Sequence, residues 1–421
     1  MGHVAHCSTR PPPCQTVGSD TTRCTIDAMI YLDNAATTPL RREALEAMLP
    51  LLTETYGNPS SAHAAGRRAR AALDEAHETV ARCLNAEPRE VVFTSGGTEA
   101  INLAIKGAAW AGKASGNQII TTAVEHHAAL HTVKHLENFG FEPVILPVDR
   151  YGRLDPDQLA AAFTDRTIVV SLMVANNEVG TIQPIAELVR AVRRHRGILV
   201  HLDAVQAAPY VAIDVKTLDV DLVSLGAHKF EGPKGMGALW MRHGTTILPQ
   251  QQGGSQERYR RAGTENVAGA VGLARAFQLC TAERPETARR LRRQRDRIRD
   301  AVTAVPGVEV TGHPRERLPG HLSLIARDTD GESVSLALDL EGICTSTGSA
   351  CTTGSTEPSH VLSAMGYPDE EARGALRISL GRQTTDEEVE RASSVIPATI
   401  ARMRAAAAAV TADPLGQGVG S

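Results

Sequence analysis

Apolar residues follow two alternating patterns between about residues 45 and 250. Helical spacing predicts helices at 42–55, 61–84, 98–112, 128–138, 155–162 and 184–196. Short apolar runs predict strands at 90–94, 118–122, 142–147, 167–174, 197–203, 220–225 and 238–242. The run 167–174 is apolar almost throughout, which is typical of a parallel strand covered by helices on both faces. The alternation therefore predicts a doubly wound α/β domain with a mostly parallel sheet, whose ligands bind at the carboxyl ends of the strands.

The pattern changes after Gly263, where a long arginine-rich helix is expected at about 266–303, followed by a smaller α+β region. Residues 1–28 contain three consecutive prolines and no hydrophobic period, and they lack the apolar core of a secretory signal. The expected parts are a disordered leader or misassigned start at 1–28, a large domain at 46–265, a small domain formed by 29–45 and 266–405, and a flexible tail at 406–421.

Composition narrows the function classes. The chain has 48 acidic and 44 basic residues, a formal charge of −4, which is too balanced for a protein that wraps nucleic acid or binds membranes through a basic patch. No apolar run approaches the roughly 20 residues that cross a bilayer. The seven cysteines are an odd number, and three of them lie in the leader. This argues against a disulfide scaffold and favours a reducing, cytoplasmic compartment.

Few amines are available for covalent chemistry, because the chain has only six lysines. Lys229 ends the loop that follows the predicted strand 220–225, and a glycine-dense turn, Gly232–Gly237, comes next. A lysine just past a buried strand is partly desolvated, which lowers its pKa and favours imine formation with a carbonyl cofactor. On its own, such a lysine is more simply read as a surface residue of a turn.

A carboxylate stands at the end of another predicted strand. Asp203 closes the run 197–203, and a buried carboxylate is costly unless a cationic group meets it. The protonated ring nitrogen of pyridoxal phosphate is such a group, and Gln206 could then hydrogen-bond the phenolic oxygen of that ring. Alternatively, Asp203 caps a helix that follows the strand.

The segment Ser95–Thr98 forms a glycine-rich turn between a predicted strand and a predicted helix. Unpaired N–H groups at a helix N-terminus, together with a threonine hydroxyl, form an anion site suited to phosphate. Turns of this kind also cap helices without binding any ligand. The Gly-x-x-x-x-Gly-Lys-Ser/Thr motif is absent, which argues against a nucleotide triphosphatase.

Nine motifs follow one another between residues 29 and 400: Leu32–Pro39, Tyr56–Ser61, Thr94–Glu99, Glu125–His127, Asn176–Glu178, Asp203–Gln206, His228–Lys229, Arg261–Thr264 and Gly348–Cys351. With these motifs the chain resembles the cysteine desulfurases, pyridoxal-phosphate enzymes of the class V aminotransferase family. The resemblance implies the fold type I architecture of these transferases, with a large doubly wound domain that binds the cofactor and a smaller α+β domain.

The resemblance also implies roles for residues around the cofactor. Lys229 is expected to hold it as an imine, Asp203 to pair with the pyridinium, and Gln206 and Asn177 to contact the phenolic oxygen. Further contacts to the cofactor and its phosphate are expected from Gly97, Thr98, Gly226, Ala227 and His228.

Four more residues receive roles from the resemblance. His126 is expected to stack on the ring and to act as an acid–base, although alone it would read as a core or helix-start histidine. Thr264 is expected to reach the phosphate from the other subunit of a homodimer. Arg377 is expected to clamp the carboxylate of the substrate with help from Asn34, and its alternative is a salt bridge at a strand end.

Residues 346–356 are small and polar, which predicts a mobile loop with an exposed Cys351. Cys83 and Cys280 lie in predicted helices and Cys344 on a short strand, where we expect them to pack. By resemblance, Cys351 is the nucleophile of the desulfurases with a longer catalytic loop. It takes sulfur from L-cysteine as a persulfide, releases L-alanine, and delivers the sulfur to an acceptor such as an iron–sulfur scaffold. Through that persulfide it would transiently ligate a nascent cluster.

Three other functions are open to this set of residues. A selenocysteine lyase, or another class V lyase or transaminase, shares the lysine and the aspartate but does not need the loop thiol. A cofactor-holding scaffold without turnover would have lost Lys229, Asp203 or Cys351, and all three are present. A cysteine hydrolase using Cys351 and His360 would lack a third group to orient the imidazole.

Overall fold

The computed structural model describes residues 29–347 and 358–412. Its large sheet has seven strands in the order β2-β8-β7-β6-β5-β3-β4. Strand β8 is antiparallel to both of its neighbours, and the other pairs are parallel. The strands are β2 (Val91–Thr94), β3 (Gln118–Thr122), β4 (Glu142–Leu146), β5 (Thr167–Met173), β6 (Leu199–Asp203), β7 (Leu222–Gly226) and β8 (Gly237–Met241). The predicted doubly wound, mostly parallel sheet is thus confirmed.

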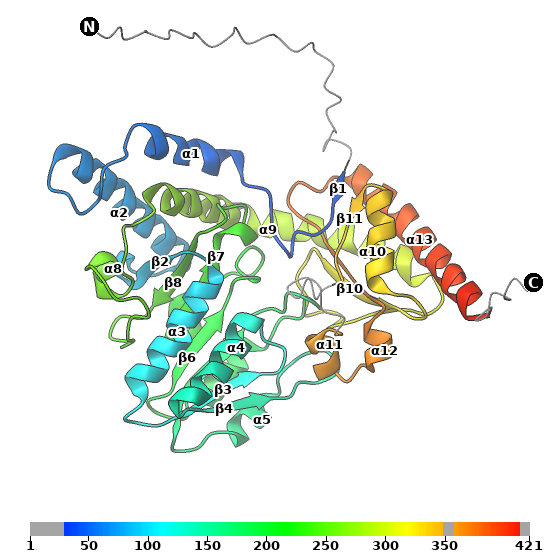
Figure 1. The fold of residues 1–421 in the computed structure, drawn as a ribbon, viewed down its shortest axis with the longest axis horizontal. Helices are drawn as coiled ribbons and strands as arrows, with labels where there is room; N and C mark the ends of the chain where they lie inside the picture. The colour runs from blue at the N-terminus through cyan, green and yellow to red at the C-terminus, as the bar shows by residue number, and fades with distance from the viewer. Residues whose placement is uncertain (1–28, 348–357, 413–421) are drawn as a thin grey trace, which may run out of the picture.

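Helices cover both faces of this sheet (Figure 1). They are α1 (Arg42–Thr53), α2 (Ala64–Leu84), α3 (Gly97–Gly112), α4 (His127–Leu136), α5 (Pro156–Ala161), α6 (Ile185–Val192), α7 (Val215–Leu218), α8 (Gln256–Tyr259) and α9 (Val267–Thr303). Helices α3 and α4 pack on one face, whereas α2, α6 and the first half of α9 pack on the other. The predicted bounds agree closely, and the predicted strand 197–203 starts late because Gly197 has a φ of 82°.

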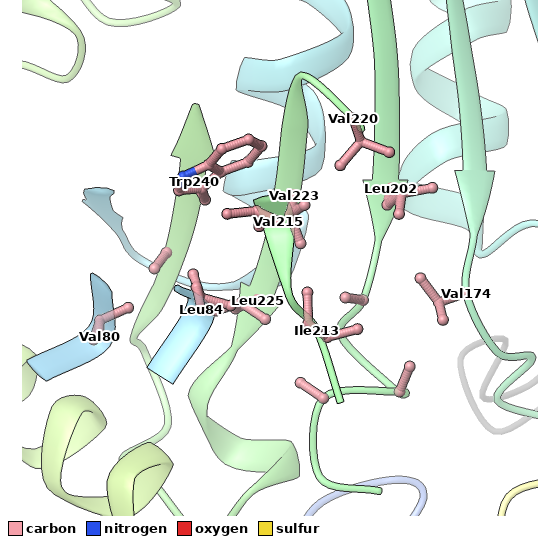
Figure 2. Packing of buried hydrophobic residues seen from close by; sticks show 14 of the residues in the cluster. Val80, Leu84, Val174, Leu202, Ile213, Val215, Val220, Val223, Leu225 and Trp240 are labelled. Carbon is pink, nitrogen blue, oxygen red and sulfur yellow. The ribbon is translucent and has the colours of Figure 1, made fainter. Parts of the chain in front are cut away.

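Alternation along the strands explains why both faces are apolar. In β2, Val91 packs with the core around α2 and α9, whereas its neighbour Val92 packs with the core around α3 and α4. Figure 2 shows the first of these cores, where Leu84 of α2 lies beside Leu225 of β7. A strand buried on both faces needs apolar residues at every position, and this is the pattern the sequence shows.

A smaller part follows α9. It contains an antiparallel sheet in the order β12-β10-β9 and a parallel pair, β1 with β11. The strands are β1 (Ile30–Tyr31), β9 (Val308–Val310), β10 (His321–Ala326), β11 (Ile343–Cys344) and β12 (Ala375–Ser379). The helices are α10 (Gly331–Leu340), α11 (His360–Ala364), α12 (Asp369–Ala372) and α13 (Asp386–Ala412). The described part of the chain therefore begins beside the small sheet and crosses to α1, while the exact domain boundaries stay a prediction.

Helix α9 connects the two parts (Figure 1). Leu273 and Phe277 lie in the core of the large sheet, and Leu291 and Ile298 lie in the core of the small one. Within residues 29–347 and 358–412, no helix combines the length and the hydrophobicity needed to cross a membrane.

Candidate functional site

The sheet register brings the candidate residues to one edge. Met173 at the end of β5 lies opposite Asp203 at the end of β6, and Asp203 lies opposite Ser224 of β7. Strand β7 ends at Gly226 and runs into a single 3-10 turn that finishes at Lys229. The predicted lysine and carboxylate thus lie at the carboxyl ends of adjacent parallel strands, where doubly wound folds bind their ligands.

The N-terminal segment packs over Lys229. The half-buried Nζ of Lys229 donates hydrogen bonds to the carbonyl oxygens of Ala35 (2.5 Å) and Ala36 (2.9 Å). The carbonyl oxygen of His228 accepts a hydrogen bond from the N–H of Thr38 at 2.9 Å. The motif at residues 32–39 therefore belongs to the site, although it lies about two hundred residues from the lysine in sequence.

Asp203 is buried and poorly satisfied. Among the described residues, its carboxylate accepts one side-chain hydrogen bond, from the N–H of Val205 at 2.9 Å. Burial raises the pKa of Asp203 to about 6, although that bond and the charge of Lys229 act in the opposite direction. The residues that follow form turns rather than the helix of the alternative interpretation. A cationic ring nitrogen would satisfy this carboxylate.

Other features of this edge fit pyridoxal phosphate. The Oε1 atom of Gln206 is buried and has no hydrogen-bond partner within the described part of the chain. A Cβ at Gly97 would lie 2.6 Å from Cγ2 of Val205, and one at Gly226 would lie 3.1 Å from Cγ1 of Val205. Only glycine lets the start of α3 approach the β6 and β7 ends this closely. Ala227 is buried behind the lysine. A buried oxygen without a partner and a backbone approach that requires glycine are both features expected of a site that binds a phosphate-bearing ring.

The start of α3 is tied to the loop that carries Thr264. Glu99 accepts the N–H of Ser95 at 2.7 Å and pairs with Arg261 at 2.9 Å. Thr98 is exposed in the first turn of α3, and Thr264 lines a pocket together with Ser95. Glu99 therefore links the first turn of α3, which contains Thr98, to the loop that carries Thr264.

His126 stands at the start of α4, where its Nδ1 accepts the N–H of Ala128 at 3.0 Å. Burial, with a smaller effect of the charge of Lys229, lowers the pKa of His126 to about 4. The ring is therefore neutral near pH 7, and because Nδ1 is an acceptor, Nε2 carries the proton. His126 does cap the start of α4, as the alternative interpretation expected, and the Nε2–H of the same ring can still donate a proton.

Arg377 lies in β12 and is almost fully buried. It pairs with Oδ1 of Asp33 at 2.8 Å and donates to the carbonyl oxygen of Asn177 at 3.0 Å. Its Nε is buried without a hydrogen-bond partner among the described residues. Asn34 lies nearby, with Nδ2 bonded to the carbonyl oxygen of Ser379 at 2.9 Å. Arg377 thus forms the salt bridge of the alternative interpretation, and its Nε can still donate a hydrogen bond to a substrate carboxylate.

Cys351 lies outside the described residues, but segments on both sides of it are placed. Ser346 exchanges two backbone hydrogen bonds with Arg377, and the hydroxyl of Ser359 donates to Glu178 at 2.5 Å. Both segments therefore reach the residues around Arg377. Within the described part of the chain, no three His, Cys, Asp or Glu side chains are arranged to hold a metal ion. The proposed cluster contact of Cys351 also lies outside that part.

The other placed thiols suit packing. Burial raises the pKa of Cys280 in α9 to about 12, and it also raises the pKa of Cys83 in α2. Cys344 of β11 lies 2.8 Å from the Sδ atom of Met29. A thiol with a raised pKa is a poor nucleophile near neutral pH.

Two buried acids received no role from the sequence. The Oε1 atom of Glu125 accepts hydrogen bonds from the Thr122 hydroxyl (2.8 Å) and the Met173 N–H (3.0 Å), and burial raises the pKa of Glu125 to about 8. Burial raises the pKa of Glu178 to about 7. Each acid stands inside a motif, Glu125 next to His126 and Glu178 next to Asn177, and its place in that motif was the signal available.

The free energy of unfolding of the apoprotein is expected to fall between about pH 6 and about pH 8, and Glu125→Gln is expected to make this fall smaller. The native state keeps a proton that the unfolded chain gives up near pH 4.5, so stability falls as pH rises, until the native pKa of about 8 is reached. Each pH unit in that window costs up to about 1.4 kcal/mol. Urea unfolding at both pH values measures the slope. The exposed Glu137→Gln should keep it, and an unchanged slope in Glu125→Gln would contradict a protonated Glu125.

Known proteins resemble this chain along most of its length. The family model described as aminotransferase class-V matches residues 30–392. The chain is 50% identical over 375 residues to "Cysteine desulfurase IscS" of Methanosarcina thermophila, which covers 89% of this chain and 93% of that protein. It is 48% identical over 376 residues to the protein of the same name from Dictyoglomus turgidum, covering 89% and 95%. A solved NifS-like protein superposes with a TM-score of 0.84 at 38% identity, covering 89% of this chain and 100% of the other.

Proposed function

The chain belongs to the class V aminotransferase family and is a pyridoxal-phosphate-dependent cysteine desulfurase, and on this premise we propose that Lys229, His126 and Cys351 carry out its reaction. The observation that supports the assignment is the placement of Lys229 beside the buried Asp203 at one sheet edge. Asp203, Gln206 and Asn177 would hold the cofactor ring. When bound, the cofactor supplies an electron sink for the substrate α-carbon.

Arg377, on strand β12 of the small sheet, would orient the substrate. Arg377 would receive the carboxylate of L-cysteine, because its guanidinium is almost fully buried and its Nε lacks a partner among the described residues. Asn34 would assist from the N-terminal segment. The Asp33–Arg377 pair keeps the guanidinium oriented when no substrate is present.

Proton movement would involve two groups. Lys229 is positioned by the carbonyl oxygens of Ala35 and Ala36, and it would remove the α-proton once it is released from the cofactor. His126 is neutral near pH 7 with the proton on Nε2, so it can donate to the product side.

Sulfur transfer would occur at Cys351. Its thiolate attacks the sulfur of L-cysteine, a sulfur–sulfur bond forms, and the carbon–sulfur bond of the substrate breaks. The electron pair stays on the substrate carbon, which is protonated to give L-alanine. Cys351 is left as a persulfide, and no external oxidant or reductant is consumed.

A homodimer would complete each site, with Thr264 of one subunit contacting the phosphate bound to the other. Mixing Lys229→Ala and Thr264→Ala subunits is then expected to restore activity at limiting cofactor. About half of the dimers are mixed and one of the two sites in each has both native residues, so about a quarter of all sites recover. Activity of the mixture against each separate variant measures this. If Thr264 served its own subunit, no mixed dimer would contain an intact site and activity would not return.

The sulfur would pass from Cys351 to an iron–sulfur scaffold protein in the cytoplasm, with the persulfide touching a nascent cluster transiently. Two relatives that are 50% and 48% identical to this chain carry the name "Cysteine desulfurase IscS", and that name supports this choice. Capture of partners by the persulfide-loaded protein tests it, and recovery of a tRNA-thiolation enzyme instead would redirect the assignment. Alanine production from L-cysteine against selenocysteine separates the selenocysteine lyase alternative.

A further inference from the structure

A buried histidine and a buried glutamate meet away from the residues discussed above. His77 of α2 and Glu257 of α8 each have a side chain that is 3% exposed, and Nε2 of His77 lies 3.0 Å from Oε2 of Glu257. The ring of His77 packs against Phe93 of β2 with centroids 4.6 Å apart. The Oε1 atom of Glu257 has no hydrogen-bond partner within residues 29–347 and 358–412.

The hydrogen bonds fix how many protons this pair holds. The Nδ1 atom of His77 lies 2.9 Å from the carbonyl oxygen of Leu73, and a carbonyl can only accept, so Nδ1 carries a proton. At 3.0 Å, Nε2 and Oε2 of Glu257 also need a proton between them, because two lone pairs would otherwise face each other. The proton between Nε2 of His77 and Oε2 of Glu257 therefore forms one hydrogen bond that joins α2 to the turn at 257–259.

The backbone around Glu257 needs support. Glu257, Arg258 and Tyr259 have φ values of 44°, 58° and 63°, three consecutive left-handed residues without a glycine. L-residues rarely adopt this conformation in succession, because Cβ approaches the backbone. Arg258 and Tyr259 are exposed, so among these three only Glu257 has a side chain buried against the rest of the molecule. Its contact with His77 offsets the strain of the turn.

The strained turn leads directly into phosphate-site residues. Arg261 follows Tyr259 after one residue and pairs with Glu99 in the first turn of α3, and Thr264 comes three residues later. We propose that His77 and Glu257 act as positioning residues, which share a proton and hold the turn at 257–259 so that Arg261 and Thr264 meet the cofactor phosphate. The Thr264 part of this inference rests on the proposed function.

The charges that face the pair are few. Arg70 of α2, Arg258 of the turn and Glu265 line the same pocket as His77 and Glu257. Phe93, which packs on the ring from β2, is uncharged. The pocket therefore adds two cations and one carboxylate to the pair.

The test is titration of the apoprotein with pyridoxal phosphate, followed by absorbance. His77→Phe keeps the ring packing but removes the hydrogen bond, and we expect about ten-fold weaker cofactor binding. His77→Gln keeps a donor to Glu257, and we expect its affinity to stay within about two-fold of that of the unsubstituted protein. Rescue by this variant separates the hydrogen bond to Glu257 from the packing of the ring.

The outcomes separate this inference from the proposed function. If Thr264→Ala binds weakly while His77→Phe binds normally, the pair has no positioning role and only this inference fails. If His77→Phe weakens binding and Thr264→Ala does not, the pair acts through Arg261, and the assignment of Thr264 fails instead. Normal binding by both variants overturns both ideas. Should His77→Phe not fold by circular dichroism, Glu257→Ala replaces it, and normal cofactor binding by Glu257→Ala overturns the proposal.

Discussion

Cys351→Ala is expected to abolish the release of L-alanine and sulfide from L-cysteine while the protein still binds pyridoxal phosphate and keeps its yellow colour. We expect a loss of about a thousand-fold or more, because removal of a nucleophile that acts with its partner groups costs this much. The half-buried thiols of Cys83 and Cys280 are poor substitutes, since burial raises the pKa of each. Alanine production and the absorbance spectrum are the two measurements.

Cys344→Ala is the matched control for this variant. Cys344 is the placed thiol that precedes Cys351 most closely in sequence, and it lies on β11 beside Met29. It should retain full activity. Equal alanine production by Cys351→Ala and the unsubstituted protein would remove the sulfur-transfer mechanism, and a loss of colour would mean that Cys351 has a structural role instead.

Lys229→Ala is expected to lose both covalent attachment of the cofactor and turnover, again by about a thousand-fold or more. The amine of Lys229 is held by the carbonyl oxygens of Ala35 and Ala36 at the end of β7, and no neighbouring lysine shares that position in the described chain. Borohydride reduction followed by mass spectrometry should find the cofactor fixed to the unsubstituted protein and not to the variant.

Lys234→Ala provides the comparison for the lysine. Lys234 lies five residues further on, in the glycine-rich turn that follows Lys229. It is exposed and should tolerate the change without loss of trapping or activity. Cofactor fixed to the Lys229→Ala protein at another lysine would show that the attachment site has been misassigned, even if turnover were lost.

The sequence predicted the large sheet well because its information is local. Runs such as 167–174 are apolar at nearly every position, and this marks a strand buried on both faces without knowledge of its neighbours. Asp203 and Lys229 could be singled out for the same reason, since Asp203 ends such a run, Lys229 closely follows another, and parallel strands end at one edge.

The features that sequence reasoning missed depend on distant partners. Whether Glu125 is protonated depends on burial beside β5, and whether Arg377 has a partner depends on Asp33 in the N-terminal segment. The His77–Glu257 pair joins residues 180 positions apart. Local sequence patterns do not indicate which distant residues pair with each other. A single sequence therefore identifies a candidate side chain but does not predict its partner or its charge state.

Helix α9 limits how the two cores can move relative to one another. It is a single rod of 37 residues with Leu273 and Phe277 embedded at one end and Leu291 and Ile298 at the other. Pro285 lies between these two pairs and cannot donate to the carbonyl oxygen four residues before it, so the rod bends most easily there. Movement of one core relative to the other would therefore bend this helix about one point.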